Sequence, residues 1–247
     1  MCPKKTFWLN TELSSTEEQL ALDEVLLNQS HNGHFQGVTV RAWMPTEPVV
    51  ILGSSSCLQE EVDVQACKDA GANILRRPSG GATVVIGPGC LMWSVITHYS
   101  FTTPGIKEIH SSMLDPLCKT LSVRSQHQVI RRGLSDLAIQ VSNDERKVSG
   151  NSLRVRRQSV LYHGTLLDAF DLPLISRVLK YPPREPDYRN HRSHEAFLSN
   201  LDIGQGVLID AIQEAFAVDQ TITRFPKHEV SQLVQNRYAN PSWIYRI

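Results

Sequence analysis

Residues 82–99, ATVVIGPGCLMWSVITHY, constrain the fold more than any other stretch, because they hold two apolar runs separated by Gly87-Pro88-Gly89. Glycine and proline interrupt regular strands, so the pattern predicts a hairpin, although its connection is longer than a two-residue turn. Strands that are joined so closely pair antiparallel, since a parallel pair needs a longer crossover. The stretch therefore favours a sheet that is at least partly antiparallel.

The rest of the chain mixes strand-like and helix-like patterns without strict alternation. Strand-like runs occupy residues 38–45, 48–53, 72–78, 136–141 and 146–167. Helical patterns occupy residues 14–29, 61–72, 106–121, 173–181, 203–218 and the start of 228–247, whose end we expect to be extended. Residues 181–195 predict a loop. We therefore expect an α+β fold with a mixed, mainly antiparallel sheet packed with helices. No linker divides the chain, which predicts one domain over residues 1–247.

The composition is that of a globular protein without an overall electrostatic footprint for nucleic acid. Lys+Arg and Asp+Glu are both 25, the formal net charge is +0, and 41% of the residues are hydrophobic. No apolar run approaches the roughly 20 residues that span a bilayer, and no apolar segment follows the N-terminal lysines as in a secretory signal. The five cysteines are widely spaced without a CxxC pair, so we expect a reducing, cytoplasmic setting.

The segment RRPSGG, residues 76–81, is the first candidate for a binding site. Glycines let backbone N–H groups approach an anion closely, and the guanidiniums of Arg76 and Arg77 match a carboxylate or a phosphate. The same residues would also suit a glycine hairpin with solvated arginines. The segment matches neither a Walker A loop nor GxGxxG, so on its own it leaves both interpretations open.

Three further segments carry a residue that could act on a substrate. Lys147 stands in RKVSGNSLR, where it is either an ordinary lysine in a wet turn or a cation held against a bound anion. Asp136 precedes a strand and is either a cap or a Mg²⁺ ligand, and His163 in YHGTLL is either structural or functional. His191 and His194 have HxxH spacing, but no third ligand supports a metal site.

Taken in order, four segments resemble the lipoate–protein ligase A family, within the wider biotin/lipoate ligase and octanoyltransferase superfamily. They are RRPSGG, SDLAI, RKVSGNSLR and HGTLL, preceded by the helical segment LALDEVLL. Each motif alone is modest evidence, and their common order and compatible spacing make the likeness specific. It covers most of residues 15–170.

The resemblance implies an enzyme with a class II biotin/lipoate ligase-like catalytic domain. Such ligases use ATP and Mg²⁺ to activate lipoate or octanoate as an acyl-adenylate, and then transfer the acyl group to a lysine of a lipoyl domain. The acceptor would be the E2 component of a 2-oxoacid dehydrogenase or the H protein of the glycine cleavage system. Two alternatives stay open: a transferase fed by acyl carrier protein or by a preformed adenylate, and a non-catalytic binding protein.

By the same resemblance, Lys147 is the catalytic cation between the acyl carbonyl and the phosphate, and Asp136 positions phosphate and Mg²⁺. An ammonium is a compact charge with three donors, which suits the charge that gathers during attack on phosphorus. The other implied substrate- and nucleotide-binding residues are Arg76, Arg77, Ser79, Gly80, Gly81, Gly150, Ser152, His163, Gly164 and Thr165. Candidates for the wall of an acyl tunnel are Val84, Val85, Leu91 and Trp93.

The sequence departs from the family in three places. Many relatives continue the glycine turn with a third glycine and a His-Asp pair, where this chain has Ala82, Ile86 and Gly87. The octanoyltransferases use a late cysteine, whereas this sequence has none after Cys118, which counts against a covalent thioester. Many bacterial ligases carry an accessory C-terminal domain, which we do not expect here, so adenylation could need a separate accessory chain.

Overall fold

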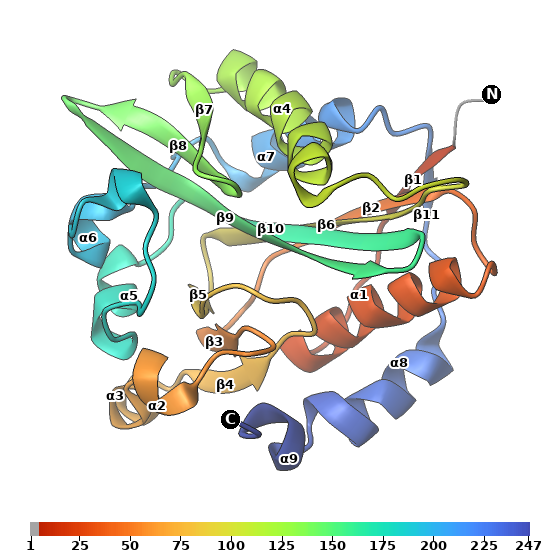
Figure 1. The fold of residues 1–247 in the computed structure, drawn as a ribbon, viewed down its shortest axis with the longest axis horizontal. Coiled ribbons are helices and arrows are strands. Elements are labelled where there is room, and N and C mark those ends of the chain that lie inside the picture. Colours follow the sequence, from red (N-terminus) through yellow and green to blue (C-terminus); the bar gives the residue numbers. More distant parts are fainter. Residues whose placement is uncertain (1–4) are drawn as a thin grey trace.

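An eight-stranded mixed sheet forms the centre of the protein, in a computed structural model that describes residues 5–247 (Figure 1). Its strand order is β11-β1-β2-β6-β10-β9-β8-β7. The strands are β1 (Thr6–Leu9), β2 (Val38–Trp43), β6 (Cys90–His98), β7 (Val129–Arg132), β8 (Asp136–Val141), β9 (Asp144–Arg156), β10 (Ser159–Leu167) and β11 (Gln220–Ile222). Strand β1 pairs parallel with β2 and β11, and the other pairs are antiparallel. The predicted mixed, mainly antiparallel sheet is confirmed.

A second sheet of three strands has the order β4-β3-β5. Its strands are β3 (Val49–Leu52), β4 (Asn73–Arg76) and β5 (Val84–Ile86). The hairpin that we predicted for residues 82–99 is wrong, because β5 pairs with β3 while β6 pairs with β2 and β10. Residues 87–89 carry the chain from one sheet to the other. Gly89 has φ +83, and a Cβ there would lie 2.2 Å from the carbonyl oxygen of Ala169, so the crossing needs glycine.

Most helices lie where the apolar patterns predicted them, with differences at their ends. Residues 58–61, 187–189 and 194–197 form short helical segments that were not predicted, and the last two lie in or reach into the predicted loop at residues 181–195. The helices are α1 (Thr16–His31), α2 (Leu58–Glu61), α3 (Val64–Asp69), α4 (Ile106–Arg124), α5 (Leu172–Val178), α6 (His194–Phe197), α7 (Gln205–Ala215), α8 (Lys227–Leu233) and α9 (Pro241–Ile244), with the 3₁₀ turn η1 (Asp187–Arg189) and the π-helical turn η2 (Val234–Tyr238). The side chain of Ser15 accepts a hydrogen bond from the backbone N–H of Glu18 and caps α1. The predicted extended end is wrong: Pro241, at the first helical position, starts α9.

Helices cover the large sheet differently on its two faces (Figure 1). Helices α4 and α7 pack on one face, in an apolar cluster that includes Leu91, Trp93 and Tyr162. Helices α1 and α8 and the small sheet lie on the other face, in a second cluster that includes Leu20, Ile51 and Met92. Within residues 5–247, no helix combines the length and the apolar character needed to cross a bilayer.

Candidate active site

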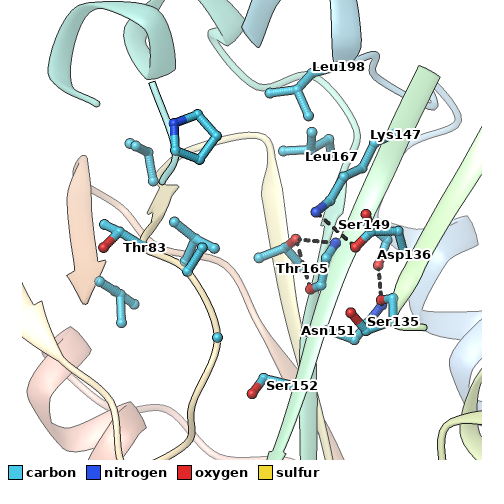
Figure 2. Close-up of a pocket in the computed structure, with 18 of the residues that line it drawn as sticks. Thr83, Ser135, Asp136, Lys147, Ser149, Asn151, Ser152, Thr165, Leu167 and Leu198 are labelled. Atoms are coloured by element: carbon cyan, nitrogen blue, oxygen red, sulfur yellow. Dashed lines mark hydrogen bonds and ion pairs between the residues drawn. The ribbon is translucent and has the colours of Figure 1, made fainter. Parts of the chain in front are cut away.

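A cavity of about 690 Å³ lies between the small sheet and the large one. Its apolar lining comes mainly from α1, β2, β3, β5, β6 and α5, for example Trp43, Val85 and Met92. Its polar lining comes mainly from β8, β9, β10 and the loop before α6, with Arg77 and Thr83 beside the glycine turn. Figure 2 shows the β8 and β9 residues gathered on one side of the cavity and Thr83 on the other. The cavity is therefore amphiphilic, and its size suits a small-molecule ligand.

Lys147 lies in the cavity wall, paired with a carboxylate (Figure 2). Its Nζ is 2.9 Å from Oδ1 of Asp136, with 25% of the lysine side chain and 10% of the aspartate side chain exposed. The hydroxyl of Tyr188 donates to Oδ2 of the same aspartate at 3.0 Å. Burial, and then the charge of Asp136, raise the pKa of Tyr188, so its phenol stays protonated. The two residues predicted for cation and phosphate positioning thus form one ion-paired group in the cavity wall.

A β-bulge and a glycine explain why Lys147 occupies this place. Strands β8 and β9 pair Leu137 with Ser149 but Ala138 with Lys147, so Val148 is an extra residue on β9. Residues 147 and 150 are three positions apart, so in a regular strand their side chains would point to opposite faces of the sheet. The extra residue in the bulge brings these two positions to the same face. A Cβ at Gly150 would lie 3.0 Å from both Cε and Nζ of Lys147. The absence of a side chain at residue 150 therefore leaves room for the lysine.

The glycine turn at residues 78–82 is held from inside by Arg77. Its Nε donates to Oγ of Ser79 at 3.0 Å, and its Nη2 donates to the carbonyl oxygens of Gly80 at 2.6 Å and Ala82 at 2.9 Å. Burial lowers the pKa of Arg77 to about 10, so the guanidinium remains charged at neutral pH. The turn is also joined to β9, since Oγ of Ser152 donates to the carbonyl oxygen of Gly80 at 2.8 Å.

The same turn packs directly on the end of β3. A Cβ at Gly53 would lie only 1.9 Å from the carbonyl oxygen of Gly81, and the N–H of Ser54 donates to the carbonyl oxygen of Ser79 at 2.8 Å. Gly81 has φ +89 and lines the cavity, as Arg77 does, whereas Ser79 and Gly80 stand behind the lining. The turn therefore presents backbone and a guanidinium to the cavity.

Arg76 does not line the cavity, although the sequence paired it with Arg77. Its Nε donates to the carbonyl oxygen of Ile244, and its Nη1 donates to those of Gly53 and Ser56, all at 2.8 Å. Successive strand residues point to opposite sides, so the two arginines separate. The structure assigns Arg76 to the attachment of the C-terminal segment, which corrects its predicted place in the binding site.

His163 belongs to a buried polar chain. Its Nε2 is 2.6 Å from Oγ of Ser79, and its Nδ1 is 3.5 Å from Oδ2 of Asp23. Oδ1 of Asp23 accepts hydrogen bonds from Arg41 at 2.7 Å and Ser94 at 2.8 Å. Burial raises the pKa of Asp23, but Arg41 and His163 outweigh it and the net shift is downward. Sequence reasoning missed Asp23, although a charged residue within the apolar stripe of α1 was a signal.

Gly164 and Thr165 fix the spacing of β10 and β9. A Cβ at Gly164 would lie 1.7 Å from Oδ1 of Asn151, and Oγ1 of Thr165 accepts the N–H of Gly150 at 3.2 Å. Nδ2 of Asn151 donates to the carbonyl oxygen of Ser135 at 2.8 Å (Figure 2). Both predicted residues line the cavity, and Asn151 is a lining residue that sequence reasoning did not single out.

The apolar wall agrees with the predicted acyl tunnel in Val84 and Val85, which line the cavity. Trp93 also borders the cavity, but its ring packs against Tyr162 and Phe216 on the face covered by α4 and α7, where Leu91 is buried. Its neighbour Met92 lines the cavity instead, because residues alternate between the faces of β6. The predicted role of Leu91 in the tunnel is therefore wrong.

Several cavity residues carry buried polar atoms without a hydrogen-bond partner in residues 5–247. They are Oγ1 of Thr83, Oδ1 of Asn151 and Nη2 of Arg189. Buried polar atoms are rarely left unpaired in folded proteins. Their presence in residues that line the cavity favours a ligand with polar groups.

Metal and thiol chemistry have little support in the described part of the chain. No group of three or more His, Cys, Asp or Glu side chains in residues 5–247 could hold a metal ion. Both oxygens of Asp136 already have partners, so this carboxylate fits Mg²⁺ only together with substrate phosphates and water. None of the cysteines in residues 5–247 lines the cavity, and Cys2 lies outside the described residues. Burial raises the pKa of Cys90 to about 12, which keeps its thiol protonated.

Residues 15–220 match the family described as the lipoyl protein ligase A/B catalytic domain. This chain belongs to that family. It is 26% identical to the octanoyltransferase LipM of Carboxydothermus hydrogenoformans over 94% of this chain and 95% of that one. It is 25% identical to lipoate-protein ligase A subunit 1 of Thermoplasma acidophilum, over 93% of this chain and 92% of that one. These relatives are enzymes, and the chain is an enzyme of their family.

Solved structures of the same family share the fold. The structure described as a bi-partite lipoate protein ligase and its E2 lipoyl domain from T. acidophilum aligns with a TM-score of 0.80 and 23% identity. The alignment covers 98% of this chain and 96% of that chain. The predicted class II biotin/lipoate ligase-like architecture is therefore confirmed.

Proposed function

We propose that this enzyme is an ATP-dependent lipoate–protein ligase. Residues 1–247 would act as one catalytic domain that activates lipoate or octanoate as an acyl-adenylate and transfers the acyl group to a lysine of a lipoyl domain. The observation that carries the proposal is the position of Lys147, on the polar side of a cavity whose other side is apolar. A medium-chain acyl adenylate has the same division between an apolar chain and a charged head.

Lys147 would serve both half-reactions from one position. During activation, its ammonium would bind the acyl carboxylate and the α-phosphate and reduce their mutual repulsion. During transfer, the same ammonium would stabilise the oxyanion that forms when the acceptor lysine attacks the carbonyl. Asp136 holds the ammonium at 2.9 Å before substrate binds, so little reorganisation is needed. Mg²⁺ would neutralise the nucleotide phosphates, with Asp136 as the protein carboxylate nearest to Lys147 in the site.

The apolar lining supports a short fatty chain as the substrate. Val84, Val85 and Met92 come from two sheets that enclose the cavity from opposite sides. The buried Arg77 and the backbone of Gly81 would meet the polar part of the acyl-adenylate. The unpaired polar atoms of Thr83 and Asn151 are further candidates for contacts with that part.

The cysteines favour an adenylate over a covalent thioester. A cysteine nucleophile must be accessible and must form a thiolate. Cys90 is fully buried, burial raises the pKa of Cys118 to about 11, and neither lines the cavity. Free thiols of this kind also support a reducing, cytoplasmic location for the enzyme.

A second candidate is an octanoyltransferase that takes its acyl group from acyl carrier protein. The relative LipM, aligned over 94% of this chain, is the observation that favours it. The similarity to a ligase subunit and to a bi-partite ligase instead supports the ATP-dependent reaction, with a separate accessory chain and an E2 lipoyl domain or H protein as acceptor.

One assay distinguishes these candidates. An apo lipoyl domain is incubated with the enzyme and with lipoate plus ATP and Mg²⁺, octanoyl–acyl carrier protein, or synthetic lipoyl-adenylate, and its mass is then measured. We expect an acyl adduct from lipoate only when ATP is present, and from lipoyl-adenylate without ATP. Labelling from the carrier protein alone would replace the ligase by the transferase, and binding of lipoyl-adenylate without any labelling would indicate a non-catalytic binding protein.

A further inference from the structure

Four arginines gather beside the glycine turn, on a part of the surface that the proposed chemistry does not use. Arg154 and Arg156 lie on β9, Arg237 lies in η2, and Arg246 follows α9. We call them the arginine patch. The chain as a whole has a formal net charge of +0, so this local concentration of positive charge needs an explanation of its own.

The arginine patch borders the cavity. Ser152 lines the cavity, and Arg154 follows two residues later on the same side of β9. Nη1 of Arg154 donates to the carbonyl oxygen of Pro78 at 2.8 Å, at the start of the glycine turn. Further along the same turn, Gly81 and Ala82 are exposed and line the cavity, so they form part of its rim.

The positive charge of the arginine patch is only partly compensated. Arg237 forms an ion pair with the buried Glu24, and Arg154 lies 3.8 Å from the same carboxylate. Arg156 donates to the side-chain oxygen of Asn28, and Arg246 donates to the carbonyl oxygen of Ser54, so both bind neutral groups.

Three arginines elsewhere on the surface are each paired with a carboxylate. Arg124 is 2.7 Å from Glu214, Arg131 is 3.3 Å from Asp115, and Arg132 pairs with Glu145. Each of these three has a carboxylate of its own. Across residues 5–247, no carboxylate lies within 4.0 Å of Arg156 or Arg246. The arginine patch, four guanidiniums that share the single carboxylate of Glu24, is thus a region of net positive charge beside the cavity rim.

Trp243 makes part of the arginine patch rigid. The guanidinium carbons of Arg237 and Arg246 both lie 3.9 Å from the centre of its ring. Nε1 of Trp243 donates to the carbonyl oxygen of Arg76 at 3.0 Å, which attaches the stack to β4. Burial, then Arg237 and Arg154, lower the pKa of Arg246, which reflects how closely the charges are packed. Guanidiniums held in this way can bind carboxylates at a small cost in side-chain entropy.

We propose that the arginine patch is a docking surface for an acidic face of the lipoyl-domain acceptor, which it orients so that the acceptor lysine reaches the cavity rim. This inference rests on the proposed function. An acidic protein fits better than a nucleic acid, because the patch is small, lies at the rim of a cavity that takes a small molecule, and belongs to a chain without net positive charge.

The test is a charge-reversal double variant, Arg156→Glu with Arg246→Glu, since these two side chains are exposed and bind neutral groups. The matched control is Lys107→Glu with Lys119→Glu, which makes the same charge change on exposed positions of α4. Fluorescence anisotropy measures the Kd of a labelled apo lipoyl domain from a 2-oxoacid dehydrogenase E2 component at low and moderate salt. This measurement requires no catalysis, so it remains informative if the proposed function fails.

We expect the patch variant to raise the Kd about tenfold or more at low salt, and the control to change it less than twofold. Pyrophosphate release from lipoate and ATP, measured without acceptor, should be the same in both variants. An unchanged Kd in the patch variant, or an equal rise in the control, would overturn the proposal. Tighter binding of a short RNA than of the lipoyl domain, lost in the patch variant, would assign the surface to nucleic acid instead.

Discussion

The two faces of the large sheet are built from the same strands and have opposite properties. On one face, Leu91 and Tyr162 pack against α4 and α7 in a continuous apolar cluster. On the other face, Met92 and His163, their direct neighbours in sequence, line a cavity with unpaired polar atoms. Because side chains alternate along a strand, one sequence can supply a stabilising surface and a binding surface together. In this protein, the face of the sheet to which a side chain points separates structural from functional residues more clearly than the residue type does.

The largest expected effect comes from the polar side of the cavity. Lys147→Ala should lower the rate of lipoyl-domain labelling about 10³-fold or more, because the oxyanion and the phosphate lose a fixed cation. The unfolding temperature should change little, since the lysine side chain is partly exposed and borders a cavity. Labelling is followed by mass spectrometry and folding by circular dichroism. Full labelling by the alanine variant would refute the role assigned to Lys147.

A pair of substitutions on β6 compares the two faces directly. Leu91→Ala should reduce the free energy of unfolding by about 2–5 kcal/mol, because it opens a void in a packed cluster. Met92→Ala should cost less stability, since its side chain already borders the cavity, and should weaken octanoate binding. Urea unfolding and calorimetry with octanoate measure the two effects. Equal losses of stability in the two variants would contradict the assignment of faces.

Gly164→Ala tests the contact between β9 and β10 beneath the cavity. The new methyl group would collide with Oδ1 of Asn151, so we expect a loss of about 1–3 kcal/mol in stability and a reduced labelling rate. Gly206→Ala is the control, because its Cβ would meet no atom within 4 Å and alanine favours helix α7. A Gly164 variant as stable as the Gly206 variant would show that Asn151 can move away.

The smallest expected effect is a pH dependence of the protein's stability, which involves one histidine on each face. Burial lowers the pKa of His110, which packs against Tyr162, and burial also lowers the pKa of His194 in the cavity wall. As the pH falls below 6.5, the ordinary pKa of histidine, these histidines bind protons in the unfolded chain before they do so in the folded protein. Stability therefore decreases as the pH falls from 7.5 to 5.5.

The histidines can be compared by thermal unfolding at those two pH values. His110→Gln should reduce the pH dependence while retaining a polar group near Tyr162, and His194→Gln should do the same in the cavity wall. Combining the substitutions should reduce it further. An unfolding temperature with the same pH dependence in the double variant and the parent would show that other groups are responsible.

The fold class was predictable because it depends on patterns that are local in sequence. The helical pattern at residues 14–29 locates α1, and the closely spaced strand patterns indicate an antiparallel sheet. The predicted hairpin at residues 82–99 failed because strand pairing is decided by distant partners: β5 has a better partner in β3, and β6 is buried between β2 and β10. Turn residues in the sequence show where a strand ends, but they do not show which sheet the strand joins.

The candidate site was predictable in its motifs and unpredictable in its contacts. Lys147 and Asp136 are both in motifs, but their pairing depends on the bulge at Val148, which the sequence does not indicate. Arg76 and Arg77 look equivalent in sequence, and only strand geometry separates them. Asp23 was missed because its partners Arg41, Ser94 and His163 come from three separate strands.

The contact between Gly53 and Gly81 has a consequence for any attempt to evolve a new substrate preference. A side chain at residue 53 would occupy the place of the carbonyl oxygen of Gly81. Substitutions at these two positions therefore cannot be chosen independently, although the positions are far apart in sequence. Libraries that vary the rest of the glycine turn should keep both Gly53 and Gly81, because Gly81 has φ +89. Libraries that vary Gly53 alone would mostly displace the turn. Substrate range in this protein is therefore linked to an inconspicuous residue at the end of β3.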